Sequence, residues 1–225
     1  MKMILSNVES PLGAMLLTTD EQCRVRALEF AERRPRLHRN LREQYREYQL
    51  TEGLAPTAVV NALQQYFVGE LEALDSIEVA TAGTELQERA WAALRRIPAG
   101  QTTTYGALGK SVGINDWRAA VDMGAAVGAN PVAIIVPCHR VLGVNGDLKG
   151  YAWGLHRKRW LLEHEASIKA CSTTPQTAPL FRCQRAGAAD PLTDADSTDA
   201  EFKRKKRSAC GRSPVNTEIS SRLTT

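Results

Sequence analysis

The sequence contains no long apolar run. No stretch approaches the roughly 18 to 20 consecutive apolar residues that cross a bilayer, so we expect no membrane span and no membrane partner. The first residues, MKMILSNVESPLG, contain neither a sustained apolar run nor a small-residue cleavage site. They do not predict a secretory signal. We therefore expect an intracellular, cytoplasmic chain.

Cysteine is also scarce, and its spacing is irregular. The five cysteines are Cys23, Cys138, Cys171, Cys183 and Cys210, with no Cys-x-x-Cys pair among them. This pattern predicts neither a disulfide framework nor a zinc knuckle. No other residues show metal-ligand spacing, so we expect no metal and no cofactor. With most thiols expected to be reduced, a cysteine that matters is expected to act as a nucleophile.

Length and composition are those of a soluble globular protein. The chain has 225 residues, of which 43% are hydrophobic and 24% charged. These values exclude a wholly disordered chain, a collagen-like repeat and a coiled-coil rod. The length fits one large domain or two small ones. We find no internal repeats.

Charge is distributed unevenly along the chain. Residues 1–85 carry nine Lys and Arg against thirteen Asp and Glu, whereas residues 86–170 carry eleven against six. A basic middle beside an acidic first half predicts that only the middle faces a polyanion. Residues 171–225 are dominated by Ser, Thr, Pro, Ala and charges, and we predict a disordered tail. Its basic run, Lys203 to Arg207, is either a solvated segment or a nucleic-acid or targeting patch.

The first part of the chain predicts a small sheet with one helix packed on it, as an N-terminal domain over residues 1–83. Three β-prone runs, at 4–8, 14–18 and 25–30, are separated by turn residues. The Arg/Glu-rich segment 32–52 is expected to be partly helical and exposed. Residues 57–71 carry apolar residues at helical spacing.

The second part, over residues 84–170, predicts a mainly helical domain. Thr84 and Gln87 form a capping-box pattern that starts a helix, and Pro98 to Gly100 ends it. Residues 104–112 and 115–127 predict two short helices about a tight connection, as in a helix-turn-helix. The remaining expectations are a buried strand at 133–136, a glycine-rich loop at 143–154 and a closing helix at 155–168.

The segment Pro137-Cys138-His139-Arg140-Val141 carries the strongest chemical signal. A thiol becomes a useful nucleophile when a neighbour takes its proton or stabilises the thiolate. Adjacent residues in a turn can place a thiol and an imidazole within reach of direct or water-bridged proton transfer. The apolar residues before Cys138 predict a rigid, partly desolvated mounting. The alternative is a buried structural cysteine beside an incidental histidine.

Glu165 in the closing helix provides a candidate third group. A catalytic imidazole usually needs a carboxylate that fixes its tautomer and stabilises its charged form. Glu165 follows Leu161 and Leu162 by one turn, so it can face inward with them. From spacing alone, an exposed surface glutamate is slightly favoured.

These residues and their flanks resemble a known family. Residues 84–168 resemble the catalytic domain of O6-alkylguanine-DNA alkyltransferases, the methylated-DNA–protein-cysteine methyltransferases. The matching segments are Thr84–Trp91, the motif IPxGxTxxY from Ile97 to Tyr105, Asn130-Pro131, Ile134–Val141, Gly150-Tyr151 and Arg157-Lys158-x-x-Leu161-Leu162-x-x-Glu165. Residues 1–83 resemble the family's more variable N-terminal domain, chiefly through Ser10-Pro11-Leu12-Gly13 and Tyr66-Phe67. The tail has no counterpart.

The resemblance implies a fold and an activity. The fold would be α/β (α+β), with a ribonuclease H-like sheet-plus-helix domain before a winged-helix-like domain that contains the helix-turn-helix. The activity would be DNA repair by irreversible, single-turnover transfer of an alkyl group from O6-alkylguanine in double-stranded DNA to a cysteine. Nucleotide flipping exposes the target base. Whether O4-alkylthymine is also a substrate stays open.

The resemblance also implies residue roles. Cys138 accepts the alkyl group, His139 acts as base through a water, and Glu165 orients His139. Tyr105 helps to rotate the nucleotide out of the helix and donates toward guanine N3. Four further residues are expected to contact the substrate or DNA or to support those contacts. Asn130 is the hinge before the active-site turn, and Tyr151 is an aromatic wall near the flipped base. Val141 contributes its backbone to base recognition, and Arg140 is placed at the DNA.

One position departs from the family pattern. The second helix of the helix-turn-helix usually carries an arginine that fills the gap left by the flipped base, and Val121 stands there. Arg118, one turn earlier, is a candidate substitute, and Val121 itself is a candidate apolar wedge. The departure concerns base extrusion and leaves the chemistry unchanged.

Two other functions remain open. One is a module that binds alkylguanine lesions without repairing them, although relatives of that kind lack the acceptor cysteine. The other is an unrelated thiol hydrolase that uses Cys138 and His139, which leaves the helix-turn-helix and the basic middle unexplained. In the preferred interpretation the chain acts as a monomer on DNA.

Overall fold

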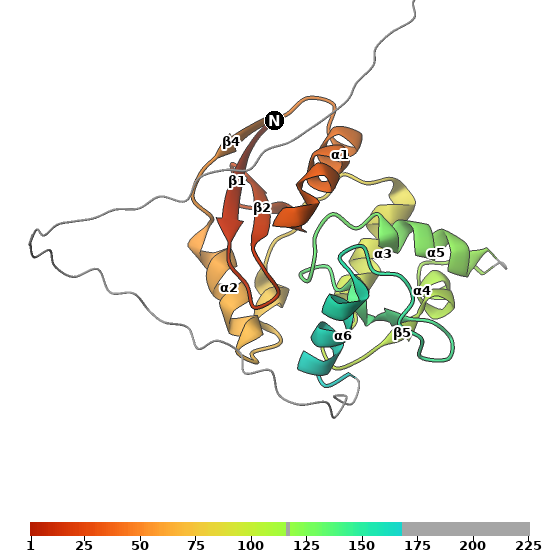
Figure 1. Ribbon diagram of the computed structural model, residues 1–225. Coiled ribbons are helices and arrows are strands. Elements are labelled where there is room, and N and C mark those ends of the chain that lie inside the picture. The colour runs from red at the N-terminus through yellow and green to blue at the C-terminus, as the bar shows by residue number, and fades with distance from the viewer. Residues whose placement is uncertain (116–117, 168–225) are drawn as a thin grey trace, which may run out of the picture. The chain divides into compact units, whose positions relative to one another are not determined.

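The computed structural model describes residues 1–115 and 118–167. Its first element is a four-stranded sheet of β1 (Lys2–Val8), β2 (Met15–Asp20), β3 (Val25–Phe30) and β4 (Gln49–Glu52). The strand order is β3-β2-β1-β4, with β2 antiparallel to both neighbours and β4 parallel to β1. Figure 1 shows this sheet with its strands in red and orange.

The first three strands are present as predicted, and hydrogen bonds within the turns between them explain where each strand ends. Gly13 adopts φ of 114° between β1 and β2, a conformation that suits glycine. Its amide donates to the Ser10 carbonyl at 3.0 Å. Between β2 and β3, Asp20 Oδ1 accepts hydrogen bonds from the Gln22 and Arg24 amides at 3.0 Å each. Both turns therefore form from adjacent residues.

The segment after β3 differs in part from the expectation. It contains η1 (Ala31–Arg33), α1 (Arg34–Gln44) and then β4, so the predicted helix is present but a strand follows it. A parallel strand needs a crossover connection, and α1 provides one. The expected exposure is also wrong for one face of α1, because Leu37 and Leu41 pack against Met3, Leu5 and Leu16 of the sheet.

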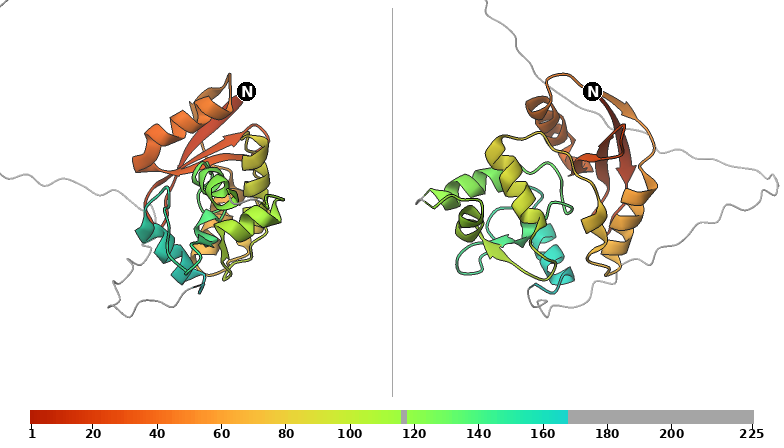
Figure 2. Two further views of the ribbon diagram at one scale, coloured as in Figure 1. Left: turned by 90° about the vertical axis from the view of Figure 1, so that its right-hand side faces the viewer. Right: turned by 180° about the vertical axis from the view of Figure 1, so that it is seen from behind.

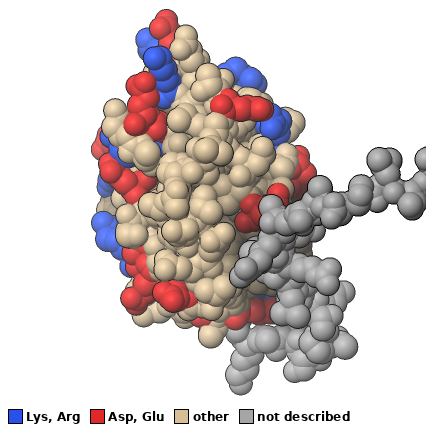
Figure 3. Space-filling model, turned by 90° about the vertical axis from the view of Figure 1, so that its left-hand side faces the viewer, with Lys and Arg blue, Asp and Glu red and all other residues tan. Residues whose placement is uncertain are grey.

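The other face of the sheet is covered by α2 (Thr57–Phe67), which is followed by η2 (Ala73–Ser76). Val59, Leu63 and Tyr66 of α2 belong to the same buried cluster as Leu17 and Leu28 of the sheet. Because both faces are covered, every residue of β2 and β3 is buried. The outward side of α2 has no charged residue, and Figure 3 shows a broad uncharged area on this side of the molecule with charges toward its margin.

The second half is mainly helical. Its elements are α3 (Glu85–Arg95), β5 (Thr103–Thr104), α4 (Tyr105–Ser111), α5 (Ala119–Gly128), η3 (Cys138–Arg140), β6 (Val141–Leu142) and α6 (Leu155–His164). The capping box that starts α3 is confirmed, with Thr84 N donating to Gln87 Oε1 at 2.8 Å. Figure 2 shows α3, α4 and α5 from two further directions.

The predicted helix-turn-helix corresponds to α4 and α5. The two helices approach closely at Gly109, where an added Cβ would lie 2.9 Å from the Ala119 Cβ. Glycine therefore permits this packing distance. In the described residues α5 begins at Ala119, later than the predicted start at 115.

The predicted strand at 133–136 is wrong. Val132 forms one bridge to Leu28, and the chain then turns at Ile134, whose φ is 65°. All four residues from Ala133 to Val136 are at most 4% exposed. Their apolar character comes from burial in a turn, and burial alone does not distinguish a strand from a turn.

One hydrophobic cluster joins the sheet, α2, α3 and the segments around Cys138. All described residues lie in a single compact unit. None of the helices in this part of the chain has the length and hydropathy needed to cross a bilayer. The closing helix is shorter than predicted: α6 ends at His164, and the chain turns at Ala166, whose φ is 56°. The predicted disorder of residues 171–225 and the Lys203–Arg207 run lie outside the described residues.

Candidate active site

A tight turn places Cys138 in the interior of the protein. The turn follows Pro137, and Cys138 itself starts η3. The Cys138 amide donates to the Val136 carbonyl at 2.8 Å. The side chain is only 4% exposed. Ile134, four residues earlier, holds a left-handed conformation that β-branched residues rarely adopt. Such strain is typical of segments that the surrounding structure fixes in place.

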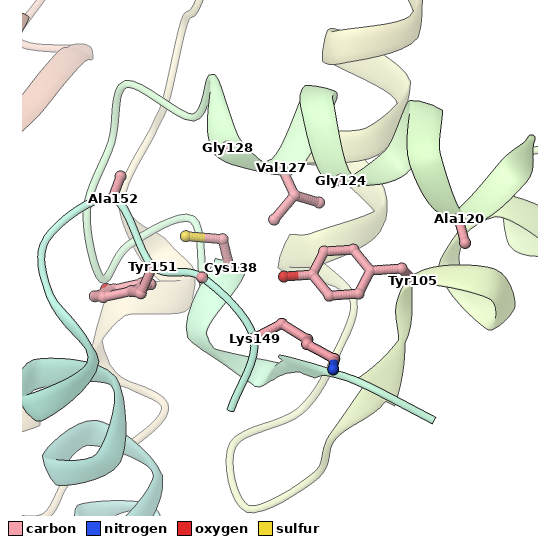
Figure 4. Close-up of a pocket in the computed structure, with 10 residues that line it drawn as sticks. Tyr105, Ala120, Gly124, Val127, Gly128, Cys138, Lys149, Tyr151 and Ala152 are labelled. Atoms are coloured by element: carbon pink, nitrogen blue, oxygen red, sulfur yellow. The ribbon is translucent and has the colours of Figure 1, made fainter. Parts of the chain in front are cut away.

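A cavity of about 480 Å³ opens beside Cys138, within the range of roughly 300–1,000 Å³ typical of small-molecule sites. Tyr105 forms one wall, residues 149–152 form another, and one face of α5 forms a third. The residues from α5 are Ala120, Gly124, Val127 and Gly128. Figure 4 shows that the Tyr105 hydroxyl points toward the side of the cavity that holds Cys138.

His139 and Glu165 form a buried pair. His139 is 0% and Glu165 1% exposed, and His139 Nε2 lies 2.9 Å from Glu165 Oε1. His139 Nδ1 is buried and has no hydrogen-bond partner among the described residues. The inward position of Glu165 excludes the exposed surface glutamate that spacing alone slightly favoured.

Arg140 also binds Glu165. Its Nε donates to Oε2 and its second terminal nitrogen to Oε1, both at 2.8 Å, and the first donates to the Ile97 carbonyl at 2.5 Å. We predicted Arg140 at the DNA interface. The guanidinium is turned inward, and three of its five N–H groups donate to Glu165 and Ile97, while a contact of Arg140 with DNA stays a prediction.

The environment sets the protonation states of these groups. Burial raises the pKa of the Cys138 thiol to about 11, against opposing effects of Asn130 and Lys158. Burial lowers the pKa of His139, although Glu165 acts in the other direction. Burial alone would raise the pKa of Glu165, but hydrogen bonds from His139 and Arg140 outweigh it and hold the pKa well below its usual range. At neutral pH the site therefore contains a neutral thiol, a neutral imidazole and a carboxylate.

Asn130 closes the segment between α5 and Cys138. Its Nδ2 donates to the Val136 carbonyl and its Oδ1 accepts from the Val132 amide, both at 2.9 Å. The side chain is fully buried. These two bonds hold the ends of the turn together, and the predicted hinge role of Asn130 stays a prediction.

Val141 and Lys158 lie behind the site. The Val141 carbonyl accepts from Lys158 Nζ at 2.7 Å. Lys158 is fully buried, and burial lowers its pKa to about 8 while the Cys138 charge acts in the opposite direction. We did not predict a role for Lys158. The spacing of Lys158, Leu161, Leu162 and Glu165 places them on one face of a helix, which could have indicated that Lys158 is buried beside Glu165.

The remaining predicted residues lie at the cavity or on α5. Tyr105 and Tyr151 both line the cavity, and burial raises the pKa of each phenol. The Tyr151 hydroxyl is buried, with no hydrogen-bond partner among the described residues. Val121 is 69% exposed on α5, and Arg118 is the residue that precedes this helix.

Two family models match most of the chain. The ribonuclease-like domain of 6-O-methylguanine DNA methyltransferase matches residues 3–81, and its DNA binding domain matches residues 85–167. The chain belongs to this methyltransferase family. It therefore has the family's two-part fold, a sheet with helices followed by a helical DNA-binding domain, as the sequence predicted.

Relatives and solved structures of the family are similar over most of their length. A methylated-DNA–protein-cysteine methyltransferase of Salmonella typhimurium is 43% identical over 170 residues, 75% of this chain and 98% of the relative. A structure described as Mycobacterium tuberculosis OGT in complex with DNA has a TM-score of 0.61 at 36% identity, covering 73% of this chain and 93% of the other. A Pyrococcus kodakaraensis methyltransferase structure, at 23% identity and a TM-score of 0.55, shares the fold.

Three further residues of this family member connect the sheet to the cavity walls. Glu29 of β3 accepts hydrogen bonds from Arg36 of α1 at 2.6 Å and from the Trp153 indole. Arg36 also donates to the carbonyls of Gly128 and Asn130 at 3.0 Å each. Sequence reasoning missed this cluster, because no local pattern places residues so far apart in the chain next to one another.

Tyr66 of α2 was predicted only as part of a helix, yet its hydroxyl donates to Glu165 Oε1 at 2.7 Å. The only sequence signal is weak: a buried tyrosine usually finds a partner for its hydroxyl. Across the described residues, no group of three or more His, Cys, Asp or Glu side chains is placed to hold a metal ion.

Proposed function

We propose that this chain repairs alkylated DNA directly, by moving an alkyl group from O6 of guanine to the Cys138 sulfur. One observation carries the proposal. A buried thiol lies at the wall of a cavity of about 480 Å³, beside an imidazole hydrogen-bonded to a carboxylate at 2.9 Å. This arrangement lies within a domain that matches the DNA-binding domain of the methyltransferase family.

The proposed chemistry begins with the thiol proton. It passes to His139 Nδ1 through a bridging water, and Glu165 stabilises the imidazolium that results. The thiolate then attacks the alkyl carbon, so a carbon–sulfur bond forms and the carbon–O6 bond breaks with its electron pair remaining on guanine. The Tyr105 hydroxyl gives its proton to guanine N3 and regains one from solvent.

Release of the alkyl group from the thioether would have to expel the Cys138 thiolate, a poor leaving group from carbon, and would need a second activated nucleophile. Cys138 is the only cysteine among the described residues that line the cavity. We therefore assign a single turnover to each molecule, after which Cys138 stays alkylated.

Access to the base requires that the nucleotide leave the helix, at an unstacking cost of a few kcal/mol. We assign α5 to the DNA groove, because Val121 is exposed there and neighbouring Ala120 and Gly124 line the cavity. Small side chains on this face permit close approach of the backbone to DNA. Asn130 then links α5 to the turn that carries Cys138.

The partner we propose is double-stranded DNA carrying O6-alkylguanine. The outward side of α2 carries no charged residue and offers no attraction to phosphate (Figure 3), and the match of residues 85–167 to the family's DNA binding domain favours the helical half as the DNA-binding side. We propose that the chain acts on DNA as a monomer. We place its activity in the cytoplasm.

Incubation with duplex DNA containing O6-methylguanine, followed by intact mass measurement, tests the proposal. The wild-type chain is expected to gain one methyl group, located on Cys138 by peptide mapping. Cys138→Ala is expected to gain none while still binding DNA, because the thiol contacts no phosphate. A lesion-binding module would bind without gaining mass, and a hydrolase would return to its starting mass. Either of these results contradicts the proposal.

A further inference from the structure

One hydrogen bond reaches the proposed catalytic pair from the N-terminal half of the chain. Tyr66, in the last turn of α2, is fully buried, and its hydroxyl donates to Glu165 Oε1 at 2.7 Å. Its backbone carbonyl lies 2.8 Å from His164 Nε2, next to Glu165 in sequence. The ends of α2 and α6 are therefore joined twice, once through the carboxylate itself.

Glu165 Oε1 is crowded with donors. It accepts from Tyr66, from Arg140 at 2.8 Å and from His139 at 2.9 Å. A carboxylate surrounded by donors stays ionised and can only accept. The His139 nitrogen that faces it must therefore carry the proton, which leaves Nδ1 with a lone pair directed away from Glu165.

We propose that Tyr66 is a positioning residue for alkyl transfer, whose hydroxyl draws negative charge from Glu165 Oε1 and so tunes the strength of His139 as a base. The inference rests on the function proposed above, because it deepens the role of the same site. It adds a residue from the sheet-plus-helix half to the reacting network of the DNA-binding half. Tyr66 acts through Glu165 and touches no reacting atom.

The sign of the effect follows from the charges around His139. The charged and titratable groups next to the pair are Lys158 and His164 from α6, Cys138 and Arg140 from η3, and Tyr66 from α2. Removing the Tyr66 hydroxyl leaves more negative charge on Oε1, since the other groups are unchanged. More negative charge favours the imidazolium, so His139 binds its proton more tightly and is protonated up to a higher pH.

The test compares Tyr66→Phe with a matched control, Tyr45→Phe. Tyr45 is 7% exposed, and its hydroxyl donates to the Ala80 carbonyl at 3.2 Å, apart from the cavity-lining residues. Transfer from free O6-methylguanine is followed by intact mass between pH 5 and 8. The transfer rate should fall at acidic pH, where His139 is protonated, and we call this part of the pH profile the acid limb. For Tyr66→Phe we expect the midpoint of the acid limb to move up by about 0.5–1 pH unit, which makes transfer roughly 3–10-fold slower at pH values below it. Tyr45→Phe should keep the wild-type limb.

If the acid limb of Tyr66→Phe has the same midpoint pH as that of the wild type, the inference is wrong. If Tyr66→Phe and Tyr45→Phe shift this midpoint equally, Tyr66 has only a structural role and the inference is also wrong. A wild-type chain that gains no mass would instead contradict the proposed function. In that case the pKa of His139, read from its ring NMR signals, still decides the inference, because the expected upward shift does not depend on transfer.

A second replacement guards against a variant that does not fold. Placing 3-fluorotyrosine at position 66 keeps the shape of the ring and makes the hydroxyl a stronger donor. The acid limb and the pKa of His139 should then move down, opposite to Tyr66→Phe. No movement, or movement in the same direction, overturns the inference.

Discussion

The two residues that we propose to react, Cys138 and His139, are neighbours that both favour the neutral form. Burial raises the pKa of Cys138 to about 11 and lowers the pKa of His139. Proton transfer between them creates two charges in a buried site, which is unfavourable unless neighbouring charges stabilise them. Glu165 lies on the imidazole side, and Lys158 favours the thiolate. The catalytic arrangement therefore consists of the stabilising groups as much as of the thiol itself.

This balance predicts the pH dependence of transfer. In the wild type the rate should rise as pH passes the lowered pKa of His139, because only the neutral imidazole accepts a proton, and should be flat near neutrality. In His139→Ala the thiolate must form without a base, so transfer at pH 7 should fall by roughly 10²-fold or more. Its rate should then rise steadily with pH toward the Cys138 pKa of about 11.

Intact mass after incubation with free O6-methylguanine, from pH 5 to 10, measures both profiles. His38→Ala is the control, because His38 lies in α1 and outside the residues that line the Cys138 cavity. Parallel profiles for wild type and His139→Ala would remove His139 from the role of base.

At the scale of an element, α5 is notable for small residues. Its ten residues, AAVDMGAAVG, include six alanines and glycines, and Asp122 is its only charged residue. Such a helix approaches DNA closely but offers few groups that hold a base out of the stack. Val121, at 69% exposure, is its largest exposed apolar side chain. The efficiency of base extrusion is thus the property most sensitive to this helix.

Val121→Arg is expected to speed repair of duplex DNA by about twofold to fivefold, from a cation and a stacking plane worth roughly 0.5–1 kcal/mol at the vacated position. Transfer from the free base should scarcely change, because it needs no flipping. Val68→Arg adds the same charge at a site that is 80% exposed at the end of α2, and should leave both rates unchanged. Equal responses of duplex and free base to Val121→Arg would contradict a role in extrusion.

Arg118 offers a second test of this helix. It precedes Ala119, the first residue of α5. If Arg118→Ala slows duplex repair by more than Val121→Arg speeds it, while free-base transfer is unchanged in both, Arg118 already holds the duplex open. The kinetic readout is the same single-turnover mass measurement.

At the scale of the whole molecule, the sheet holds the walls of the cavity. Leu28 of β3 pairs through its backbone with Pro131 and Ala133 at 3.0 and 2.9 Å. Next to it, Glu29 and Arg36 connect the carbonyls of Gly128 and Asn130 to Trp153. Trp153 in turn lies edge-on to Tyr151, with ring centroids 5.1 Å apart. The N-terminal half is thus a scaffold for the cavity as well as a separate sheet.

Arg36→Lys is expected to reduce transfer from the free base several-fold, because a single ammonium cannot span Glu29 and two carbonyls. Arg26→Lys is the matched control. The Arg26 side chain is 11% exposed against 12% for Arg36, and it binds the buried Asp20 and the Ala80 carbonyl. Both variants should lose stability, on the order of 1–3 kcal/mol, measured by denaturant unfolding. Equal transfer rates in the two would show that Arg36 serves stability alone.

Much of the fold follows from residues close together in the chain. The Ser10–Gly13 turn, the capping box at Thr84 and the stop at Pro98–Gly100 are local interactions, so the first three strands and α3 could be predicted correctly. The same holds for the two helices of the helix-turn-helix. The nucleophile and its neighbour His139 are adjacent in sequence, so a candidate reaction centre was also visible.

The sequence by itself therefore determined the local elements, the family and the position of the thiol that we propose to react. Only the tertiary structure decided that residues 133–136 form a buried turn, that β4 pairs beside β1, and that the Arg140 guanidinium binds Glu165. It also brought Tyr66 to Glu165 across 99 residues and Trp153 to Glu29 across 124. Hydrophobic period and turn chemistry act over a few residues, whereas these contacts depend on which surfaces of the two halves pack together.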